Sequence, residues 1–327
     1  MAATLGALLV LLPAGVAGGD PRPARASGVV RAAGSKTICI YASLGQQLAH
    51  AEASTGISYH CLEAFLTGAN TWAAWARPWI TNPRYGYTAW VGQPGRSRTL
   101  VLTVNLVPNG VARQPGLRAS CAAGRFVAYA RQLSRSLVAA GLGRSVVRLG
   151  PEMNGPWEVD WIGRTAVQWH LWAACFAREV TTMRSVPGAR FLFDWTVNAG
   201  YEDLPMADYY PGDAVVDVIG IDAYDEASIK LPPVGSPSRW PVLASEPLGL
   251  YEVGAFARAH HKPMSIPEWG TLSTNGDDGA YVAGVGRYVA AHDVAYEAWY
   301  DAGDNHVYQL SARQAPRSLA AYRRFIG

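Results

Sequence analysis

Two glutamates lie at or near the ends of apolar segments. A buried, isolated carboxylate in such a segment would cost free energy. Glu152 closes the largely apolar segment Ser145–Glu152, and Glu268 lies near the end of the similar segment Lys262–Gly270. A carboxylate inside an apolar core is unfavourable unless it is paired, whereas at the mouth of a cleft it can take part in chemistry. Two carboxyl groups about 5–5.5 Å apart can flank a glycosidic bond, one as acid/base and the other as nucleophile. We therefore expect Glu152 and Glu268 to act as such a pair.

Eight segments of β type alternate with amphipathic helical segments, and this order predicts how the two glutamates are positioned. The strand segments are Thr37–Ala42, Tyr59–Leu66, Thr99–Val107, Ser145–Glu152, Ala189–Thr196, Val215–Tyr224, Lys262–Gly270 and Val294–Ala302. The helical segments are Gln46–Ala53, Ser120–Ala140, Thr165–Ser185, Leu248–His260, Gly279–Ala291 and Pro316–Ile326. Strands that are apolar on both faces are typical of parallel sheets covered by helices.

This alternation predicts an α/β fold, a single-domain (β/α)8 barrel. An open doubly wound sheet is the alternative, but no Gly-rich phosphate-binding fingerprint follows the first strand. In a closed barrel the fourth and seventh strands lie across the pore from each other, and the loops after the strands build the site. The predicted pair would therefore meet at the carboxyl end of the barrel.

Four motifs resemble segments of glycoside hydrolase family 26. Arg148–Trp157 is similar to its acid/base segment, Phe193–Trp195 with Asn198 to its fifth strand, Tyr210–Asp225 to its sixth, and Pro267–Gly270 to its nucleophile segment. The motifs occur in the family's order, and the resemblance covers roughly residues 37–327. It implies a clan A barrel with a retaining mechanism, Glu152 as acid/base and Glu268 as nucleophile.

The family's substrates are mainly β-mannans, with some glucans and xylans, so the resemblance also implies endo-β-mannanase activity. Mannanases of the family usually carry histidine immediately before the acid/base glutamate, where this chain has Pro151. We therefore expect an outlying branch that acts on a β-linked polysaccharide, either mannan-like or a bacterial exopolysaccharide.

Further side chains near strand ends are predicted to bind substrate. Arg148 is expected to pair with Glu268 and keep it ionised, and Tyr224 to donate a hydrogen bond to it. Polar candidates for sugar contacts are Arg148, Asn154, Asp194, Asn198, Asp222 and Tyr224. Aromatic rings stack on the apolar faces of sugars, and the candidate platforms are Trp157, Trp161, Trp195, Trp269 and Trp299, with core packing as the alternative for each.

The N-terminal residues and the cysteines indicate export. Residues 1–33 are predicted to be a signal peptide with a low-complexity leader, because an apolar run precedes small residues, and 34–327 the catalytic domain. Four cysteines in an exported chain favour two disulfides, for which we expect Cys39–Cys61 and Cys121–Cys175; buried free thiols are the alternative. The protein is predicted to be secreted, extracellular or in the cell envelope, with no membrane contact beyond the leader.

Charge and motif content exclude several other classes. The 327 residues carry a net charge of +3, which gives no electrostatic basis for binding nucleic acid. No HExxH, CxxC or Gly-x-Ser-x-Gly motif occurs, so we expect no metal, no cofactor and no serine nucleophile. We expect a monomer whose partner is a polysaccharide or oligosaccharide. The alternatives are a non-catalytic polysaccharide-binding barrel and a transglycosylase of the same fold.

Overall fold

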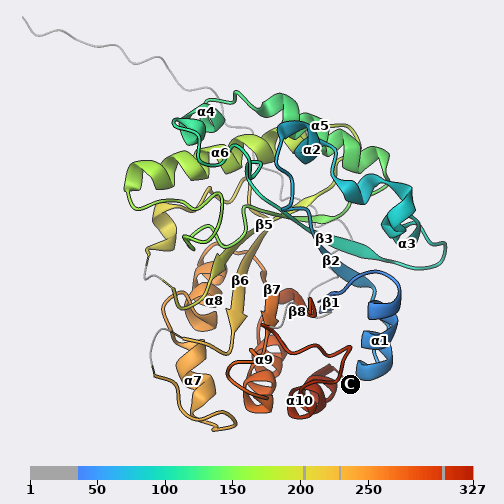
Figure 1. Cartoon of the computed structure of the whole chain (residues 1–327). Coiled ribbons are helices and arrows are strands. Elements are labelled where there is room, and N and C mark those ends of the chain that lie inside the picture. Colours follow the sequence, from blue (N-terminus) through green and yellow to red (C-terminus); the bar gives the residue numbers. More distant parts are fainter. Residues whose placement is uncertain (1–35, 202–203, 228–229, 304–305, 327) are drawn as a thin grey trace, which may run out of the picture.

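Eight parallel strands close into a barrel in the computed structural model, which describes residues 36–201, 204–227, 230–303 and 306–326 (Figure 1). The strands are β1 (Thr37–Tyr41), β2 (Cys61–Phe65), β3 (Thr99–Val104), β4 (Val146–Leu149), β5 (Leu192–Asn198), β6 (Val218–Tyr224), β7 (Met264–Gly270) and β8 (Val294–Tyr300). They pair in chain order, and β8 pairs with β1. The predicted (β/α)8 barrel is confirmed, while the predicted leader, residues 1–33, lies outside the described residues.

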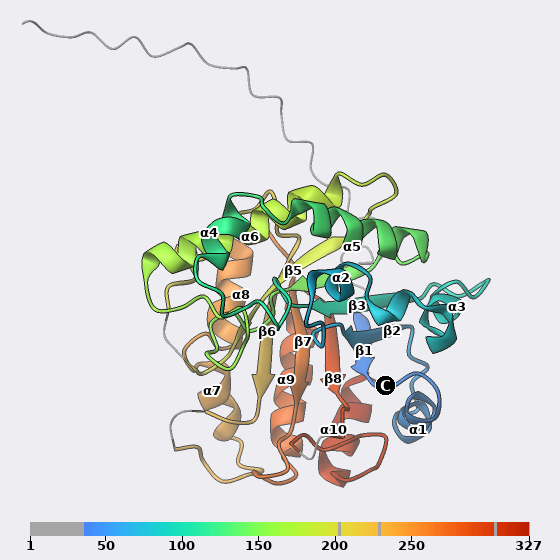
Figure 2. The same ribbon diagram turned by 45° about the horizontal axis from the view of Figure 1, so that its top comes forward.

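Helices surround the barrel, as both views show (Figure 2). They are α1 (Gln46–Thr55), α2 (Trp72–Ala76), α3 (Tyr87–Val91), α4 (Leu117–Ala122), α5 (Val127–Ala139), α6 (Ala166–Arg184), α7 (Arg239–Ala244), α8 (Leu250–Ala259), α9 (Gly279–Ala291) and α10 (Pro316–Ile326), with short 3-10 turns at Trp79–Thr81, Pro83–Tyr85 and Met206–Asp208. Arg323 of α10 donates to the Ser54 carbonyl of α1 (2.8 Å), which joins the two ends of the helix ring. None of the described helices is long and apolar enough to cross a membrane.

One segment that is predicted as a single helix forms two helices in the structure. The segment expected as a single helix, Ser120–Ala140, is α4 followed by α5, and the break contains Gly124 at φ +82°. Glycine enters this left-handed region without a Cβ clash and therefore ends helices readily. The break lets α4 turn away from α5 and pack on α6.

Alternation along the strands separates residues inside the barrel from residues facing the helices. Cys39, Cys61, Val101, Val146 and Val218 form an apolar layer with Tyr296. Their strand neighbours Ile40, Leu62, Leu102, Val147 and Ile219 instead join the large core that includes the helices. This two-residue period determines which residues near the strand ends can reach the mouth.

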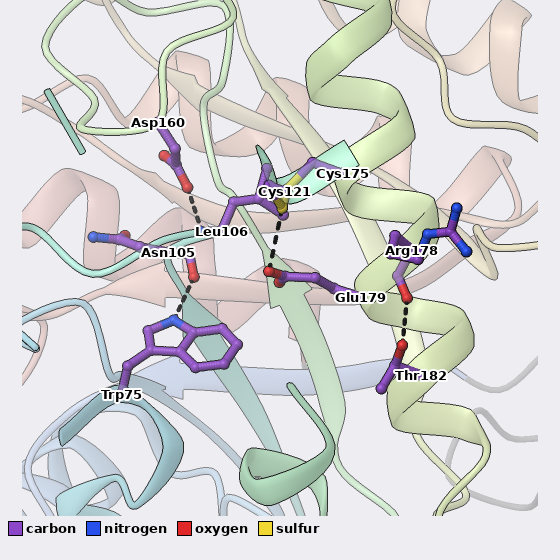
Figure 3. The surroundings of a disulfide bond; sticks show 9 residues. All are labelled: Trp75, Asn105, Leu106, Cys121, Asp160, Cys175, Arg178, Glu179 and Thr182. Atoms are coloured by element: carbon purple, nitrogen blue, oxygen red, sulfur yellow. Dashed lines mark hydrogen bonds between the residues drawn. A yellow bond between two sulfur atoms is a disulfide. The ribbon is translucent and has the colours of Figure 1, made fainter. Parts of the chain in front are cut away.

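Both predicted disulfides are present. Cys39–Cys61 joins β1 to β2, whose two cysteines are register partners. Cys121–Cys175 joins α4 to α6, and Figure 3 shows it beside the Glu179 carboxyl, 3.6 Å from the Cys121 sulfur. The second disulfide therefore fixes α4, and with it the end of the loop that follows β3.

Candidate active site

Glu152 lies in a strained turn just beyond β4. The strand ends at Leu149, three residues earlier than predicted, because Gly150 (φ +60°) and Glu152 (φ +47°) both adopt left-handed backbone conformations. The Glu152 amide donates to the Thr196 carbonyl (3.1 Å), which ties the turn to β5. A non-glycine residue in this region costs about 1–2 kcal/mol, and such strain is concentrated at functional sites.

The Glu152 carboxyl accepts one hydrogen bond at each oxygen. Trp157 Nε1 donates to Oε2 (2.6 Å), and Asn198 Nδ2 donates to Oε1 (2.7 Å). Burial, followed by the nearby charge of Glu268, raises the pKa of Glu152 to about 7. Buried Asn154 exchanges two hydrogen bonds with the Asn198 backbone (2.8 and 2.9 Å), so it positions Asn198 and does not itself face the opening.

Glu268 reaches the pore through an irregularity in β7. The register between β7 and β8 shifts between Ile266 and Trp269, and a bulge of this kind re-aims side chains. The carboxyl of Glu268 accepts from Arg148 Nη1 (3.0 Å) and Tyr224 Oη (2.8 Å). Trp269 turns toward the helices in consequence.

Arg148 is the buried cation beneath this pair. It is fully buried and contacts Asp222 and Glu63 as well as Glu268. Burial, partly offset by Arg148, raises the pKa of Glu63 to about 8, so Glu63 is mostly protonated at pH 7. Arg148 therefore joins Glu63, Asp222 and Glu268 in one buried network.

Glu152, Asp222 and Glu268 converge on one point. One carboxyl oxygen from each lies within 4.8 Å of the others. Clusters of three carboxylates can hold a cation, but here Arg148 already lies against two of them. The second group of potential ligands, Cys121, Cys175 and Glu179, has its sulfurs in a disulfide rather than as thiolates.

Asp194 lies deep inside the barrel and not at the predicted sugar site. It is fully buried and accepts hydrogen bonds from Thr196, Ser265 and Tyr296 at 2.6–2.8 Å. It precedes Asn198 by four residues on β5, which is about 13 Å along a strand. Gly220 leaves room for this network, since a Cβ there would lie 2.5 Å from the Asp194 carboxyl.

Three of the five candidate platforms face the helix layer. Trp195, Trp269 and Trp299 are fully buried; Trp195 packs against Tyr209, Tyr210 and Phe256, and the other two against each other and Tyr322. These three tryptophans therefore pack in the core, which was the alternative to a sugar-binding role for each. Trp157 is 51% exposed beside Glu152, and Trp161 is half-buried in the same loop.

Three aromatic rings form a wall at the mouth of the barrel, and the sequence analysis did not name them as a set. The half-buried rings of Tyr41, Phe65 and Tyr300 lie 4.6–5.9 Å apart at the ends of β1, β2 and β8. Tyr224 lies against Tyr300 at 6.4 Å, which connects this wall to Glu268. Period-two counting from inward-facing Cys39, Cys61 and Tyr296 leads to all three rings, so the signal was present in the sequence.

Comparison with known proteins agrees with this geometry. The model of Glycosyl hydrolase family 26 matches residues 143–231, the part of the chain that holds β4, Glu152 and β6. Over these residues the chain is similar to glycoside hydrolase family 26. This agrees with the resemblance carried by the sequence motifs, and no curated protein sequence matches the chain.

Solved structures share the fold of this chain at low sequence identity. A Cellulomonas fimi endo-beta-1,4-mannanase double mutant is 19% identical at TM-score 0.59, over 88% of this chain and 70% of that one. A Bacillus subtilis mannanase is 15% identical at TM-score 0.59, over 86% and 85%. A family 26 beta-mannanase from Bacteroides ovatus is 14% identical at TM-score 0.56, over 89% of each chain. At these identities the likeness supports the barrel alone.

Proposed function

We propose that this protein is a secreted retaining glycoside hydrolase, with Glu152 as acid/base and Glu268 as nucleophile. The observation that carries the proposal is the convergence of the two carboxyls, whose closest oxygens lie within 4.8 Å. Retaining glycosidases hold their carboxyl groups about 5–5.5 Å apart, whereas inverting ones leave about 6.5–9.5 Å for a water molecule. The family 26 match over residues 143–231 supports the same class.

The environments of the two carboxyls suit their proposed tasks. Glu152, with its pKa raised to about 7, retains a proton to give to the departing oxygen. Glu268 attacks the anomeric carbon, and its carboxylate is oriented by Arg148 and Tyr224. A covalent glycosyl-enzyme forms; deprotonated Glu152 then activates a water molecule that releases the sugar with retained configuration.

The proposed substrate is a β-linked polysaccharide. The structural neighbours are named as mannanases, and Pro151 before the acid/base glutamate distinguishes this chain from the mannanase pattern. Trp157 and the wall of Tyr41, Phe65 and Tyr300 provide exposed or half-buried ring faces beside the carboxyl pair. The two disulfides are compatible with export to an oxidising environment.

The test is release of reducing sugar from mannan, glucan, xylan and bacterial exopolysaccharides. Wild type is compared with Glu152→Ala, Glu268→Ala and a control, Asp293→Ala, which removes an exposed carboxylate before β8 at the opposite end of the barrel. We expect activity on at least one glycan, lost by several orders of magnitude in the two site variants and kept in the control. Activity that survives Glu268→Ala would overturn the nucleophile assignment. Glycan binding without hydrolysis would favour a non-catalytic barrel.

Added azide separates the two roles on an activated aryl glycoside of the sugar that is hydrolysed. In Glu152→Ala, azide should restore turnover and give a glycosyl azide of retained configuration, because it replaces the deprotonated acid/base in the second step. In Glu268→Ala it should give the inverted azide, because it replaces the nucleophile. The opposite stereochemistry would exchange the two assignments.

A further inference from the structure

A cavity of about 650 Å³ opens on the Glu152 side of the carboxyl pair. Its walls come from three segments: residues 109 and 112–119 after β3, residues 156–159 and 161 after β4, and Gln168 and Leu171 of α6. Trp157 lines it and is the same side chain that donates to Glu152. The volume lies in the range of small-ligand pockets, about 300–1,000 Å³. A sugar unit in this cavity would therefore share a wall with the proposed acid/base.

Two arginines give the cavity its charge. Arg113 is exposed and Arg118 half-buried, and both line the cavity. Arg118 also donates to the Trp161 carbonyl, which holds its guanidinium at the wall. A guanidinium can bind a carboxylate or sulfate through two parallel hydrogen bonds.

The acidic groups nearby only partly oppose this charge. Glu158 lines the cavity, but burial, then the charges of Asp160 and Glu152, raise its pKa to about 8. Asp160 lies behind Arg118 in a smaller cavity, and its carboxyl is bonded to the Leu106 amide (Figure 3). Burial raises the pKa of Asp160 to about 6. Two arginines and one glutamate line the cavity, so the lining is net positive even when Glu158 is ionised.

We propose that this cavity binds an anionic sugar residue of the substrate on the Glu152 side of the scissile bond. The anion is a uronic acid carboxylate or a sulfate ester. The apolar face of the sugar stacks on Trp157, and its anionic group pairs with Arg113 and Arg118. The inference rests on the proposed function and narrows its substrate class to acidic polysaccharides.

The test measures the affinity of the protein for three methyl β-glycosides by NMR titration. They are methyl glucoside, methyl glucuronoside and the 6-O-sulfated methyl glucoside. We expect wild type to bind at least one anionic ligand about tenfold more tightly than the glucoside, a difference of about 1.4 kcal/mol, and this preference to weaken with added salt. The ligand that shows the preference identifies the anion as carboxylate or sulfate.

The variants are Arg113→Gln, the double change Arg113→Gln/Arg118→Gln, and the charge-matched control Arg96→Gln, an exposed arginine before β3 at the other end of the barrel. The double variant should bind all three glycosides alike, and the control should match wild type. If the double variant fails to fold, Arg113→Gln alone should still reduce the preference several-fold, because its side chain is exposed. Equal affinities in wild type, no binding of any ligand, or a preference that survives both changes would overturn the inference.

The titration is independent of hydrolysis, so the two proposals fail separately. An anion preference without hydrolysis on any glycan would leave the cavity assignment standing and contradict the enzyme. Hydrolysis of a neutral polysaccharide together with equal affinities for the three glycosides would support the enzyme and contradict the cavity assignment.

Discussion

Glu152 and Glu268 occupy different environments although their carboxyl oxygens lie within 4.8 Å of each other. Glu268 has a cation and a phenol as partners, whereas Glu152 has two neutral donors. Burial and the charge of Glu268 favour the protonated form of Glu152, and the Trp157 hydrogen bond opposes them. Unequal surroundings of this kind let two identical residues serve as acid and nucleophile.

The pH dependence of kcat/KM tests the state of Glu152. Activity should fall as pH rises through about 7, because only the protonated carboxyl can donate to the leaving oxygen. The Trp157 hydrogen bond stabilises the charged form and lowers the pKa of Glu152, so Trp157→Phe should move this limb to higher pH. A limb that stays in place, or moves to lower pH, would contradict the account of Glu152.

Backbone strain at Glu152 predicts an unusual order of stability. At ordinary helix or strand positions glycine is about 0.5–1 kcal/mol less stable than alanine. Here φ is +47°, so Glu152→Gly should be about 1 kcal/mol more stable than Glu152→Ala, as measured by urea unfolding. The alanine variant is the matched control, since both changes remove the carboxyl. An alanine variant as stable as the glycine variant would mean that the turn is unstrained.

At the scale of elements, hydrogen bonds hold the loop after β4 at several points. The Glu152 amide is bonded to β5, Asn154 to the Asn198 backbone, and Asp160 to the Leu106 amide beyond β3. Gly155 lies between the first two anchors and Asp160. A Cβ there would lie 2.4 Å from the Trp157 ring, so only glycine lets this ring reach Glu152 without a shift.

Gly155→Ala should therefore displace Trp157. We expect kcat/KM to fall about 10- to 100-fold, which corresponds to about 1.4–2.7 kcal/mol of transition-state stabilisation, together with a change in tryptophan fluorescence. Gly68→Ala is the control, because a Cβ there meets nothing within 4 Å. Equal activity in the two variants would show that the position of Trp157 does not matter.

The sequence was sufficient for the barrel but not for every side chain at its mouth. Eight apolar segments separated by helices have few alternative arrangements, and the polar ends of β4 and β7 indicated the carboxyl pair. Trp195 and Trp299 were misjudged because nearness to a strand end was counted without the two-residue alternation. Trp195 is three positions from inward-facing Asn198, so it points to the helices.

No sequence pattern predicts the turn at Glu152 or the bulge in β7. The turn requires a left-handed conformation at a glutamate, which local propensity disfavours, and the bulge depends on pairing with β8. The cavity beside Trp157 was missed for a similar reason, since the loops after β3 and β4 meet only through tertiary contacts such as Asp160 with Leu106.

At the scale of the whole molecule, several buried acids keep their protons to higher pH than a free glutamate does. Burial raises the pKa of Glu63 and of Glu297 to about 8, and that of Glu152 to about 7. Glu297 lies between barrel and helices, where it accepts from Trp269 Nε1 (2.6 Å). Folding therefore binds protons at these sites relative to the unfolded chain, where glutamate titrates near 4.3.

Thermal stability should consequently decrease as pH rises from 5 to 8. A carboxyl whose pKa is raised by folding contributes most stability below its unfolded value and loses it as pH passes the folded value. Tm should fall by several degrees across this range by calorimetry, and Glu297→Gln should reduce the slope because glutamine does not ionise. A Tm that rises between pH 5 and 8 would contradict the assigned protonation states.

The most direct test of the carboxyl pair is to trap the glycosyl-enzyme. A 2-deoxy-2-fluoro glycoside of the hydrolysed sugar, with an activated leaving group, is incubated with wild type and with Glu268→Gln, and labelled peptides are identified by mass spectrometry. The account predicts one added sugar on Glu268 in wild type and none in the variant. Label on Glu152 or on another residue, or no label together with product of inverted configuration, would contradict it.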